Sequence, residues 1–361
     1  MQLQTFLREG GTPDDLKRLY AISSRRHRRH DNLVLFKYNQ IESPFGEQIV
    51  REARGIILDE SRGWEVVSRG FDKFFNHGEG HAAPIDWSSA KVHEKVDGSL
   101  CVLYHYADQW RVATSGTPDA SGEVSGFGLT FEKYFWDTAR DVGLQWPAET
   151  DLCFMLELSG PYNRIVVPHE KASLTVLGMR DRRTGIEDSV DRAAGLLGIK
   201  PAASFSLASV ADIVASFERM SPLSQEGYVV VDGAFRRIKV KHPGYVALHH
   251  AKDGMSHKAM VEIVRSGESS EVIAAFPELG AMFATIKANF DATVAELETM
   301  YTRIADIAEQ KAFALEATKT RCSAPLFALR SKKTPSVRAW LAKAPIDTAV
   351  ALLEHNRKDQ Q

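Results

Sequence analysis

The sequence predicts an α+β protein in which a β-rich domain is followed by an all-helical domain. Up to about residue 250, short apolar segments rich in β-branched and aromatic residues are bounded by Gly, Asp or Pro, as strands usually are. From about residue 254, apolar residues recur at three- and four-residue spacing, which is the period of helices. We place the domains at residues 1–250 and 251–361, because His242-Pro243-Gly244 and Asp253-Gly254 interrupt regular structure near that boundary.

The first domain is predicted to consist mainly of strands with a few helices. Asp97-Gly98 lies between two apolar segments, and this dipeptide in that setting favours a hairpin. The expected strands are residues 32–38, 54–59, 64–71, 90–96, 100–106, 152–158, 174–179, 227–231 and 235–242. Helical periodicity predicts helices at residues 131–142, 189–197 and 210–220.

The second domain is predicted to contain one long helix with shorter ones around it. The long helix should run from residue 279 to about 318, with Pro277 near its start, where proline is tolerated. Short helical segments are expected at residues 261–264 and 272–276. Two more should follow Pro335 and Pro345.

The composition narrows the class of protein. With 44% hydrophobic and 25% charged residues, the chain can bury a core. Lys and Arg together number 45 against 47 Asp and Glu, so any nucleic-acid surface must be local. The 3 widely separated cysteines predict a reducing compartment, with neither a disulfide framework nor a zinc cluster. We find no leader and no membrane-length apolar run, so we expect a cytoplasmic protein.

Lys95 is the candidate nucleophile. It precedes the predicted Asp97-Gly98 turn, so its backbone is constrained and its side chain can be directed into a pocket. A lysine acts as a nucleophile only when neutral, which requires a pKa well below the reference of about 10.4. Burial or neighbouring cations lower the pKa of a lysine. Lys239 and Lys241 are two residues apart in a predicted strand and therefore point the same way.

Two carboxylates stand beside apolar strand segments. Glu157 follows Cys153-Phe154-Met155-Leu156, and Glu226 precedes Gly227-Tyr228-Val229-Val230. A carboxylate in such a setting is costly unless it is paired or holds a cation. Mg²⁺ uses few carboxylates and fills its other positions with waters and phosphate oxygens. These residue types together predict a site for phosphate, metal and a lysine nucleophile.

The pattern resembles the covalent nucleotidyltransferases, and within them the bacteriophage tRNA-repair RNA ligases of the RNA ligase 1 type. The resemblance runs in order from about residue 38 to residue 249. Its motifs are Ala53-Arg54-Gly55-Ile56, Lys73-Phe74-Phe75-Asn76, Lys95-Val96-Asp97-Gly98, Phe154-Met155-Leu156-Glu157, Gly160-Pro161-Tyr162-Asn163-Arg164-Ile165-Val166, Glu226-Gly227-Tyr228-Val229 and Ile238-Lys239-Val240-Lys241. It implies that residues 1–250 form an adenylyltransferase domain of antiparallel β-rich type.

The resemblance implies roles for individual residues. Lys95 would attack the α-phosphate of ATP and carry AMP, and Tyr245 would serve the ligation step. The implied ATP-binding residues are Tyr38, Arg54, Lys73, Phe75, Asp97, Gly98, Glu157, Leu177, Glu226, Lys239 and Lys241. The implied metal ligands are Glu157, Glu226 and Glu271.

The resemblance also implies a reaction and its partners. AMP would pass from Lys95 to an RNA 5′-phosphate, and a 3′-hydroxyl would then displace it, with ATP and Mg²⁺ as cofactors and Mn²⁺ as a substitute. The RNA would be tRNA-like, chosen by residues 251–361. The sequence contains no Gly-x-x-x-x-Gly-Lys-Ser/Thr phosphate-binding loop, so a separate kinase and phosphatase would prepare the ends. For a viral source, the expected location is the host cytoplasm.

Several residues have a plainer interpretation or depart from the pattern. The phage enzymes carry a basic residue before a glycine where this chain has Ser115-Gly116, so a phosphate or ribose contact is lost there or supplied elsewhere. The basic run from Ser23 to His30 fits either RNA binding or a solvated loop, with the loop slightly favoured. Phe75 fits core packing as well as ligand contact. Lys239 and Lys241, taken alone, would also fit the solvent-exposed face of an edge strand.

Other functions remain as alternatives. A nick-sealing polynucleotide ligase shares the same core, and joining of single-stranded RNA against a nicked duplex would separate the two. A capping guanylyltransferase would continue into a β-barrel, which the helical pattern after residue 254 disfavours. A non-catalytic protein that binds RNA ends is expected to lack the nucleophile or its cationic neighbours, whereas Lys95, Lys239 and Lys241 are all present.

Overall fold

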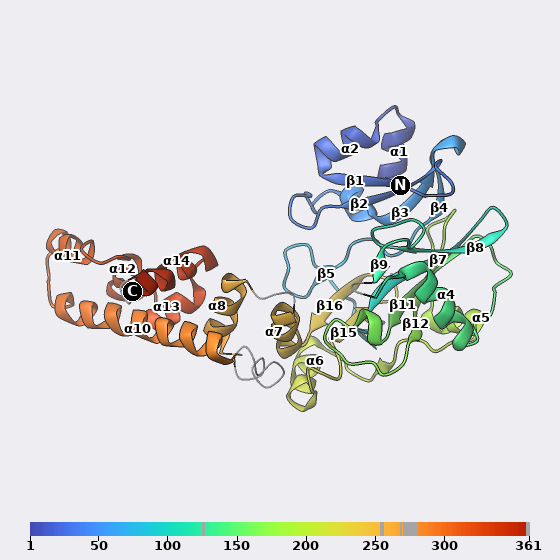
Figure 1. Cartoon of the computed structure of the whole chain (residues 1–361). Coiled ribbons are helices and arrows are strands. Elements are labelled where there is room, and N and C mark those ends of the chain that lie inside the picture. Colours follow the sequence, from blue (N-terminus) through green and yellow to red (C-terminus); the bar gives the residue numbers. More distant parts are fainter. Residues whose placement is uncertain (125–126, 253–255, 268, 270–279, 359–361) are drawn as a thin grey trace. The chain divides into compact units, whose positions relative to one another are not determined.

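The computed structural model describes residues 1–124, 127–252, 256–267, 269 and 280–358 (Figure 1). The chain divides into two compact units, Met1–Tyr245 and Val246–Gln361. The division falls inside helix α7 (Pro243–Lys252), close to the boundary predicted after residue 250. Pro243 begins this helix instead of interrupting regular structure, because the first turn of a helix does not use the N–H that proline lacks.

A four-stranded antiparallel sheet, ordered β1-β2-β3-β4, forms the N-terminal part of the first unit. Its strands are β1 (Ile22–Arg26), β2 (Leu33–Tyr38), β3 (Arg54–Asp59) and β4 (Glu65–Ser68). Helices α1 (Gln2–Arg8), α2 (Pro13–Tyr20) and α3 (Gln48–Glu52) accompany it, with a short 3₁₀ turn at Glu60–Arg62. The apolar side chains of Val34, Phe36 and Ile56 pack with Leu3 and Leu16 from the helices.

The solvated-loop interpretation of the basic run is wrong for its first half. Residues Ser23 to Arg26 belong to edge strand β1, which pairs with β2. Only Ile22 of this strand is buried, so the sequence lacks the apolar alternation that identifies a strand. Pairing with the apolar strand β2 holds β1 in the sheet.

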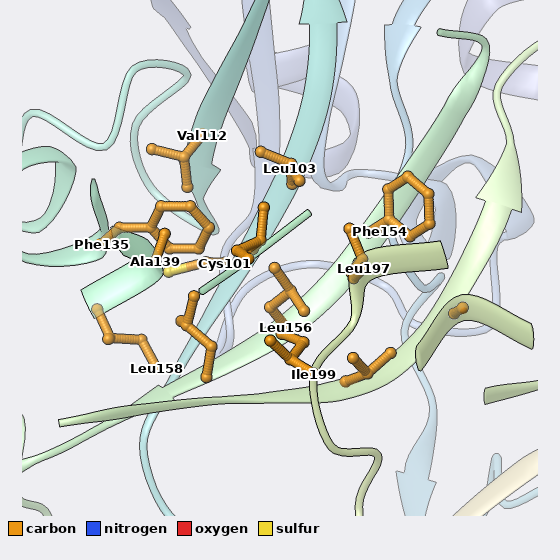
Figure 2. Packing of buried hydrophobic residues seen from close by; sticks show 14 of the residues in the cluster. Cys101, Leu103, Val112, Phe135, Ala139, Phe154, Leu156, Leu158, Leu197 and Ile199 are labelled. Carbon is orange, nitrogen blue, oxygen red and sulfur yellow. The ribbon is translucent and has the colours of Figure 1, made fainter. Parts of the chain in front are cut away.

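A five-stranded antiparallel sheet ordered β13-β12-β11-β7-β8 forms the centre of the first unit. Its strands are β7 (Ser99–Tyr106), β8 (Gln109–Thr114), β11 (Leu152–Ser159), β12 (Ser173–Asp181) and β13 (Glu187–Asp188). Helices α4 (Phe131–Asp141) and α5 (Val190–Leu197) pack against one face, confirming two predicted helices. The shared core includes Cys101, Phe135, Phe154, Leu156 and Leu197 (Figure 2).

The opposite face of this sheet is also covered. Along β11, Phe154, Leu156 and Leu158 belong to the core of Figure 2, whereas Cys153 and Met155 belong to a second cluster with residues of the N-terminal sheet. Both faces are therefore buried, which explains the continuous apolar run in the sequence. Since side chains alternate along a strand, Glu157 lies on the face of Met155.

A second five-stranded sheet, ordered β14-β6-β15-β16-β5, completes the first unit. Its strands are β5 (Phe75–Asn76), β6 (Lys91–Glu94), β14 (Ser204–Phe205), β15 (Gly227–Val231) and β16 (Arg237–Lys241), with only the β16–β5 pair parallel among the pairs described. Helix α6 (Val210–Ser216) and a 3₁₀ turn at Phe217–Arg219 cover its outer face, replacing the single helix predicted at residues 210–220. Minor elements of the unit are β9 (Glu123–Val124), β10 (Leu129–Thr130) and a 3₁₀ turn at Pro161–Asn163.

The second unit is helical throughout its described residues, in agreement with the predicted fold class. Beyond α7 its helices are α8 (His257–Ser266), α10 (Gly280–Ile304), α11 (Gln310–Ala317), α12 (Ala324–Arg330), α13 (Val337–Lys343) and α14 (Ile346–Lys358) (Figure 1). The helices expected after Pro335 and Pro345 are confirmed as α13 and α14. The short helix predicted at residues 272–276 lies outside the described residues.

The predicted single helix from residue 279 to 318 is wrong, because the chain turns between α10 and α11. Arg330 donates hydrogen bonds to the carbonyl oxygens of Ile307 (2.8 Å) and Ala308 (2.9 Å) at this turn. These carbonyls belong to the turn and lie outside both helices, so a distant side chain supplies the donors that helical pairing does not. In the described part of the chain, no helix is long and apolar enough to cross a membrane.

Candidate active site

A cavity of about 180 Å³ lies between the two five-stranded sheets of the first unit. Leu100, Glu157 and Leu177 line it from the central sheet. His93, Glu94, Val229, Val231, Arg237, Lys239 and Lys241 line it from the second sheet. On β15 and β16, Tyr228, Val230, Ile238 and Val240 instead face the core beside α6. Alternation along these strands therefore separates an apolar outer face from a charged inner face.

Lys95 enters this cavity from the end of β6. Its backbone N–H donates to the carbonyl of Gly227 (2.9 Å), which continues the pairing of β6 with β15 by one residue. Its side chain is 21% exposed, and its Nζ lies 2.5 Å from Oε2 of Glu226. The predicted nucleophile is thus confined in a cavity and accessible to a ligand.

The segment after Lys95 is held by Asp97 and Gly98. The buried Asp97 carboxylate accepts hydrogen bonds from the backbone N–H groups of Val166 (2.9 Å) and Val167 (2.7 Å) and from the hydroxyl of Tyr245 (2.7 Å). A Cβ on Gly98 would stand 2.5 Å from the carbonyl oxygen of Leu158, so only glycine fits there. Asp97 and Gly98, predicted as ATP-binding residues, fix the backbone around Lys95, and neither lines the cavity.

Glu226 is shared by two lysines. Its Oε2 is paired with Lys95, and its Oε1 lies 2.8 Å from Nζ of Lys241. Burial acts to raise the pKa of Glu226, but the two ammonium groups outweigh it and lower the pKa below its ordinary value. Glu226 is therefore a carboxylate that holds both lysines at the cavity, and Gly227 beside it has a φ of +142°, which L side chains rarely adopt.

A cluster of cations forms another wall. Arg54 and Lys239 lie over the ring of Phe74, each 5.0 Å from its centroid, and Arg54 also donates to the carbonyl of Asp72 at 3.5 Å. Burial, reinforced by Arg54, Lys73, Lys95 and Lys241, lowers the pKa of Lys239 to about 7. Lys239 forms no ion pair with an acid among the described residues. Such crowding of cations favours a bound anion.

Lys73 and Phe75 lie beside the cavity and do not line it. The Nζ of Lys73 lies 5.0–5.4 Å from the ring centroids of Tyr38, Phe45 and Phe75. Burial, followed by the charge of Arg54, lowers the pKa of Lys73. Phe75 is buried against Phe45 (5.8 Å between ring centroids), which fits the core interpretation. Tyr38 and Arg54 line a neighbouring groove together.

Glu157 is buried on the central sheet, and among the described residues no group donates a hydrogen bond to its side-chain carboxylate. Burial raises its pKa to about 8, with Lys95 and Arg54 opposing and Glu226 reinforcing the shift. A buried carboxyl with these neighbours would be stabilised as an anion by a further cation. Oxygen ligands at a phosphate-sized cavity fit Mg²⁺ or Mn²⁺, which need only one or two carboxylates when phosphates complete the shell.

The predicted metal ligands are only partly assembled. Glu157 and Glu226 interact electrostatically, but Glu226 is already occupied by two lysines. Glu271 lies outside the described residues. Among the residues that the structure describes, no group of three His, Cys, Asp or Glu side chains is placed to hold a metal. A divalent cation here would therefore depend on the phosphates of a bound nucleotide.

Sequence reasoning missed several residues of the cavity, among them Phe74, His93, Glu94 and Arg237. The sequence prediction chose Phe75 instead of its neighbour Phe74. Only the structure shows that Phe74 lines the cavity. Arg237 lies 4.4 Å from the ring centroid of Phe71 and forms an ion pair with Glu187 (2.5 Å). Arg237, Lys239 and Lys241 alternate along β16, so the two-residue spacing that identified the lysines also reaches Arg237.

Comparison with known proteins gives a consistent result. Residues 52–245 match a family model described as RNA ligase. The chain is 27% identical over 296 residues to the RNA ligase of Rhodothermus phage RM378, covering 64% of this chain and 67% of that protein. It is 28% identical over 280 residues to a "putative bifunctional polynucleotide kinase/RNA ligase" of Autographa californica nuclear polyhedrosis virus, covering 72% of this chain and 40% of that protein. An archaeal ATP-dependent RNA ligase structure aligns with a TM-score of 0.48 and 16% identity over 74% of this chain and 71% of that one.

Proposed function

The chain belongs to the RNA ligase family, and from this premise we propose that it uses ATP to join RNA ends by carrying AMP on Lys95. One observation carries the proposal: the side chain of Lys95 reaches a cavity that also presents Arg54, Lys239 and Lys241. A nucleoside triphosphate would supply negative charge to Arg54 and Lys239, which form no ion pair with an acid among the described residues, and would compete with Glu226 for the two lysines that it holds. A protein that only binds RNA ends would not need a lysine confined in a cavity among other cations.

In the first step, Nζ of Lys95 attacks the α-phosphate of ATP, a phosphoramide bond forms, and pyrophosphate leaves. The amine must first separate from Glu226 and give up a proton to solvent before it can attack. Glu226 keeps Lys241 at the cavity through its other oxygen. Lys239 and Lys241 then stabilise the charge that develops on the departing phosphates.

In the second and third steps, AMP passes to an RNA 5′-phosphate, and a 3′-hydroxyl displaces it to form the phosphodiester. Tyr245 supports these steps indirectly, since its hydroxyl donates to Asp97 and so holds the segment that carries Lys95. Burial, together with the negative charges of Glu226 and Asp97, raises the pKa of Tyr245, so the phenol remains protonated as a donor.

A divalent cation, Mg²⁺ or Mn²⁺, fits beside Glu157. When bound, it would offset the negative charge of the phosphates that otherwise repel an incoming nucleophile or RNA end. Glu157 would hold it as an anionic oxygen ligand, which lowers the pKa of that carboxyl from about 8.

The experiment is transfer of label from ATP labelled at the α-phosphate to the protein, with Mg²⁺, followed by denaturation. We expect covalent label on the wild type, none on Lys95→Ala and little from labelled GTP. Lys133→Gln, a change on the exposed face of α4, is the matched control and should label normally. Wild-type protein that is folded, unmodified by intact mass and still unlabelled would contradict the proposal.

The substrate ends are proposed as 5′-phosphate and 3′-hydroxyl. The viral relative is named as a kinase and ligase, and this chain spans 40% of its length, which agrees with a separate healing enzyme acting before this one. The protein should join 5′-phosphorylated single-stranded or stem-loop RNA more readily than a nicked duplex. Joining of 5′-hydroxyl ends, or a preference for nicked duplex DNA, would contradict this choice of substrate.

Residues 251–361 are proposed to select the RNA, with tRNA-like stem-loops as the expected class. Their helical fold differs in kind from the sheets that hold the cavity, so recognition and adenylylation are assigned to different units. A competition assay with tRNA fragments and unstructured RNA of equal length tests this. Equal joining of both by the full chain would contradict it.

A further inference from the structure

A second hollow adjoins the cavity and shares Arg54 with it. This groove, of about 700 Å³, is lined by Lys17, Ser23, Lys37, Tyr38, Arg54 and Ser115, among others. Its walls come from α2, from strands β1, β2 and β3, and from the turn that follows β8. The groove is therefore separate from the two five-stranded sheets but reaches the nucleotide cavity at one residue.

The cations of this groove are not paired at close range with acids, although Glu157 and Asp72 act on Arg54 from a greater distance. Lys37 and Arg54 are direct cross-strand neighbours on β2 and β3, and like charges in that position repel. Among the described residues, Lys17, Lys37 and Arg54 form no ion pair with an acid. Glu42 also lines the groove, but its Oε2 accepts a hydrogen bond from Nδ2 of Asn39 at 3.0 Å.

The turn after β8 lies close to Lys37. The Nζ of Lys37 is 3.8 Å from the point where a Cβ on Gly116 would stand. Gly55 has a φ of +80°, and a Cβ there would lie 3.1 Å from Cα of Ser115, so the turn packs closely on β3. The turn, with its small side chains, thus forms the wall of the groove beside Lys37, which is half-buried and lines the same groove.

The positive surface continues along edge strand β1. Ser23 pairs with Lys37, and Arg25 pairs with Leu35, so Ser23, Arg25 and Lys37 point to one face of the sheet. Arg26, on the other face, forms an ion pair with Glu60 at 2.8 Å. Arg25 is exposed and forms no ion pair with an acid within the described residues. Arg25 is thus aligned with the groove, whereas the charge of its neighbour Arg26 is neutralised by Glu60.

We propose that this groove binds the backbone phosphates of the RNA strand next to the end being joined, with Arg25 and Lys37 as phosphate contacts and Arg54 as the link to the cavity. The inference rests on the proposed function and adds the surface along which RNA approaches. Arg and Lys contacts to phosphate position a nucleic acid without reading its sequence. Binding of this kind is salt-dependent, because each neutralised phosphate releases counterions.

The test compares wild type with the double variant Arg25→Gln/Lys37→Gln. Binding of fluorescent, 5′-phosphorylated single-stranded RNA is measured across a salt series, without ATP. We expect at least about tenfold weaker binding. The slope of log K against log salt should fall by about 1.4, at about 0.7 for each lost phosphate contact. Lysyl-AMP formation from labelled ATP, measured on the same preparations, should persist in the variant.

The matched control is Lys133→Gln/Arg140→Gln, which removes the same charge from an exposed ion-pair cluster around Asp137 on α4. It should bind RNA like wild type, and thermal unfolding should show that both double variants are folded. Unchanged affinity and slope in Arg25→Gln/Lys37→Gln would overturn the inference.

A different result would also overturn the inference: loss of lysyl-AMP formation with normal RNA binding would assign the groove to the phosphates of ATP. Failure of the proposed function is distinguishable from either result, because it appears in the wild type as absence of lysyl-AMP. The RNA-binding comparison would still decide whether the groove binds RNA.

Discussion

Glu157 is a single residue whose protonation links stability to pH. Its pKa of about 8 in the folded protein lies above the ordinary 4.5, because burial penalises the anion. Between pH 4.5 and 8 the folded state holds a proton that the unfolded state has lost, so the stability it provides is fully present below pH 4.5 and is lost as the pH rises from there through about 8. Glu157→Gln should therefore gain thermal stability relative to wild type as the pH rises, with a larger advantage near pH 9 than near pH 6.

Differential scanning calorimetry at both pH values, without nucleotide or metal, checks the Glu157 prediction. Glu298→Gln, an exposed change on α10, should give the same difference from wild type at each pH. A Glu157→Gln variant that is uniformly less stable than wild type would show instead that the carboxylate is needed for folding.

Gly98 is a second residue at which a single change should be costly, because there is no space for a Cβ atom. A Cβ there would meet the carbonyl oxygen of Leu158 at 2.5 Å and Cγ of Glu157 at 3.1 Å, so Gly98→Ala must displace backbone. Overpacking of this kind costs about 1–3 kcal/mol. A shift of about 1 Å at Lys95 should slow lysyl-AMP formation by about 100-fold.

Denaturant unfolding and the rate of label transfer test the Gly98→Ala prediction. The matched control is Gly195→Ala on α5, where a Cβ would meet no atom within 4 Å. This control should keep both stability and rate. Normal adenylylation by Gly98→Ala would mean that the close contact between the ends of β7 and β11 does not set the position of Lys95.

At the scale of elements, strand β16 presents apolar residues to one core and cations to the cavity. The pKa of Lys239 falls from 10.5 to about 7, since burial and neighbouring cations penalise its charge. The unfolded chain therefore binds more protons than the folded one between these values. Lys239 destabilises the fold fully below pH 7, and the penalty shrinks as the pH rises toward 10. Lys239→Met should raise the unfolding temperature more at pH 6 than at pH 9.5.

Thermal unfolding without ligand tests the Lys239 prediction, with Lys200→Met, an exposed change, as control. The same Lys239→Met protein should lose most of its lysyl-AMP formation, because the phosphate contact proposed for Lys239 would be gone. A stability gain that does not depend on pH would contradict the prediction.

The turn between α10 and α11 depends on one distant side chain. Arg330 donates to two carbonyl oxygens there and lies 4.2 Å from the ring centroid of Phe313. Hydrogen bonds from a charged group contribute about 1.5–3 kcal/mol. Arg330→Met should therefore cost about 2 kcal/mol in the stability of the second unit. Denaturant unfolding followed by tryptophan fluorescence measures it, and Lys333→Met, an exposed change, should cost little.

At the scale of the whole molecule, each unit has its own core. The described clusters of buried apolar residues in the first unit end with Val240 and draw on no residue of the second. A chain of residues 1–252, which ends with α7, should therefore fold and form lysyl-AMP at a rate within about tenfold of the full chain. Circular dichroism and label transfer test this, and an unfolded fragment would contradict it.

Much of the first unit could be predicted, since its strands carry strong local signals. The runs around Phe154 and Val230 are apolar enough to identify buried strands, and Glu157 and Glu226 were found from their place beside them. Lys95 was found from the turn at Asp97-Gly98, and Lys239 and Lys241 from their two-residue spacing in a predicted strand. The shorter elements were missed: β1 has one buried residue, and β5 and β14 have two residues each. Their stability comes from pairing with neighbours, which leaves little trace in local sequence.

The sequence by itself determined the fold class, the strand alternation that directs Lys239 and Lys241 to one face, and the choice of Lys95 as the candidate nucleophile. Only the tertiary structure decided that Asp97 braces the backbone, that Glu226 holds two lysines, and that Phe74 faces the cavity while Phe75 packs in the core. The reason is physical. Strand alternation and turn preference depend on neighbouring residues in the sequence. The hydrogen-bond donors of a carboxylate depend on the fold: those of Asp97 come from segments 69 to 148 residues away.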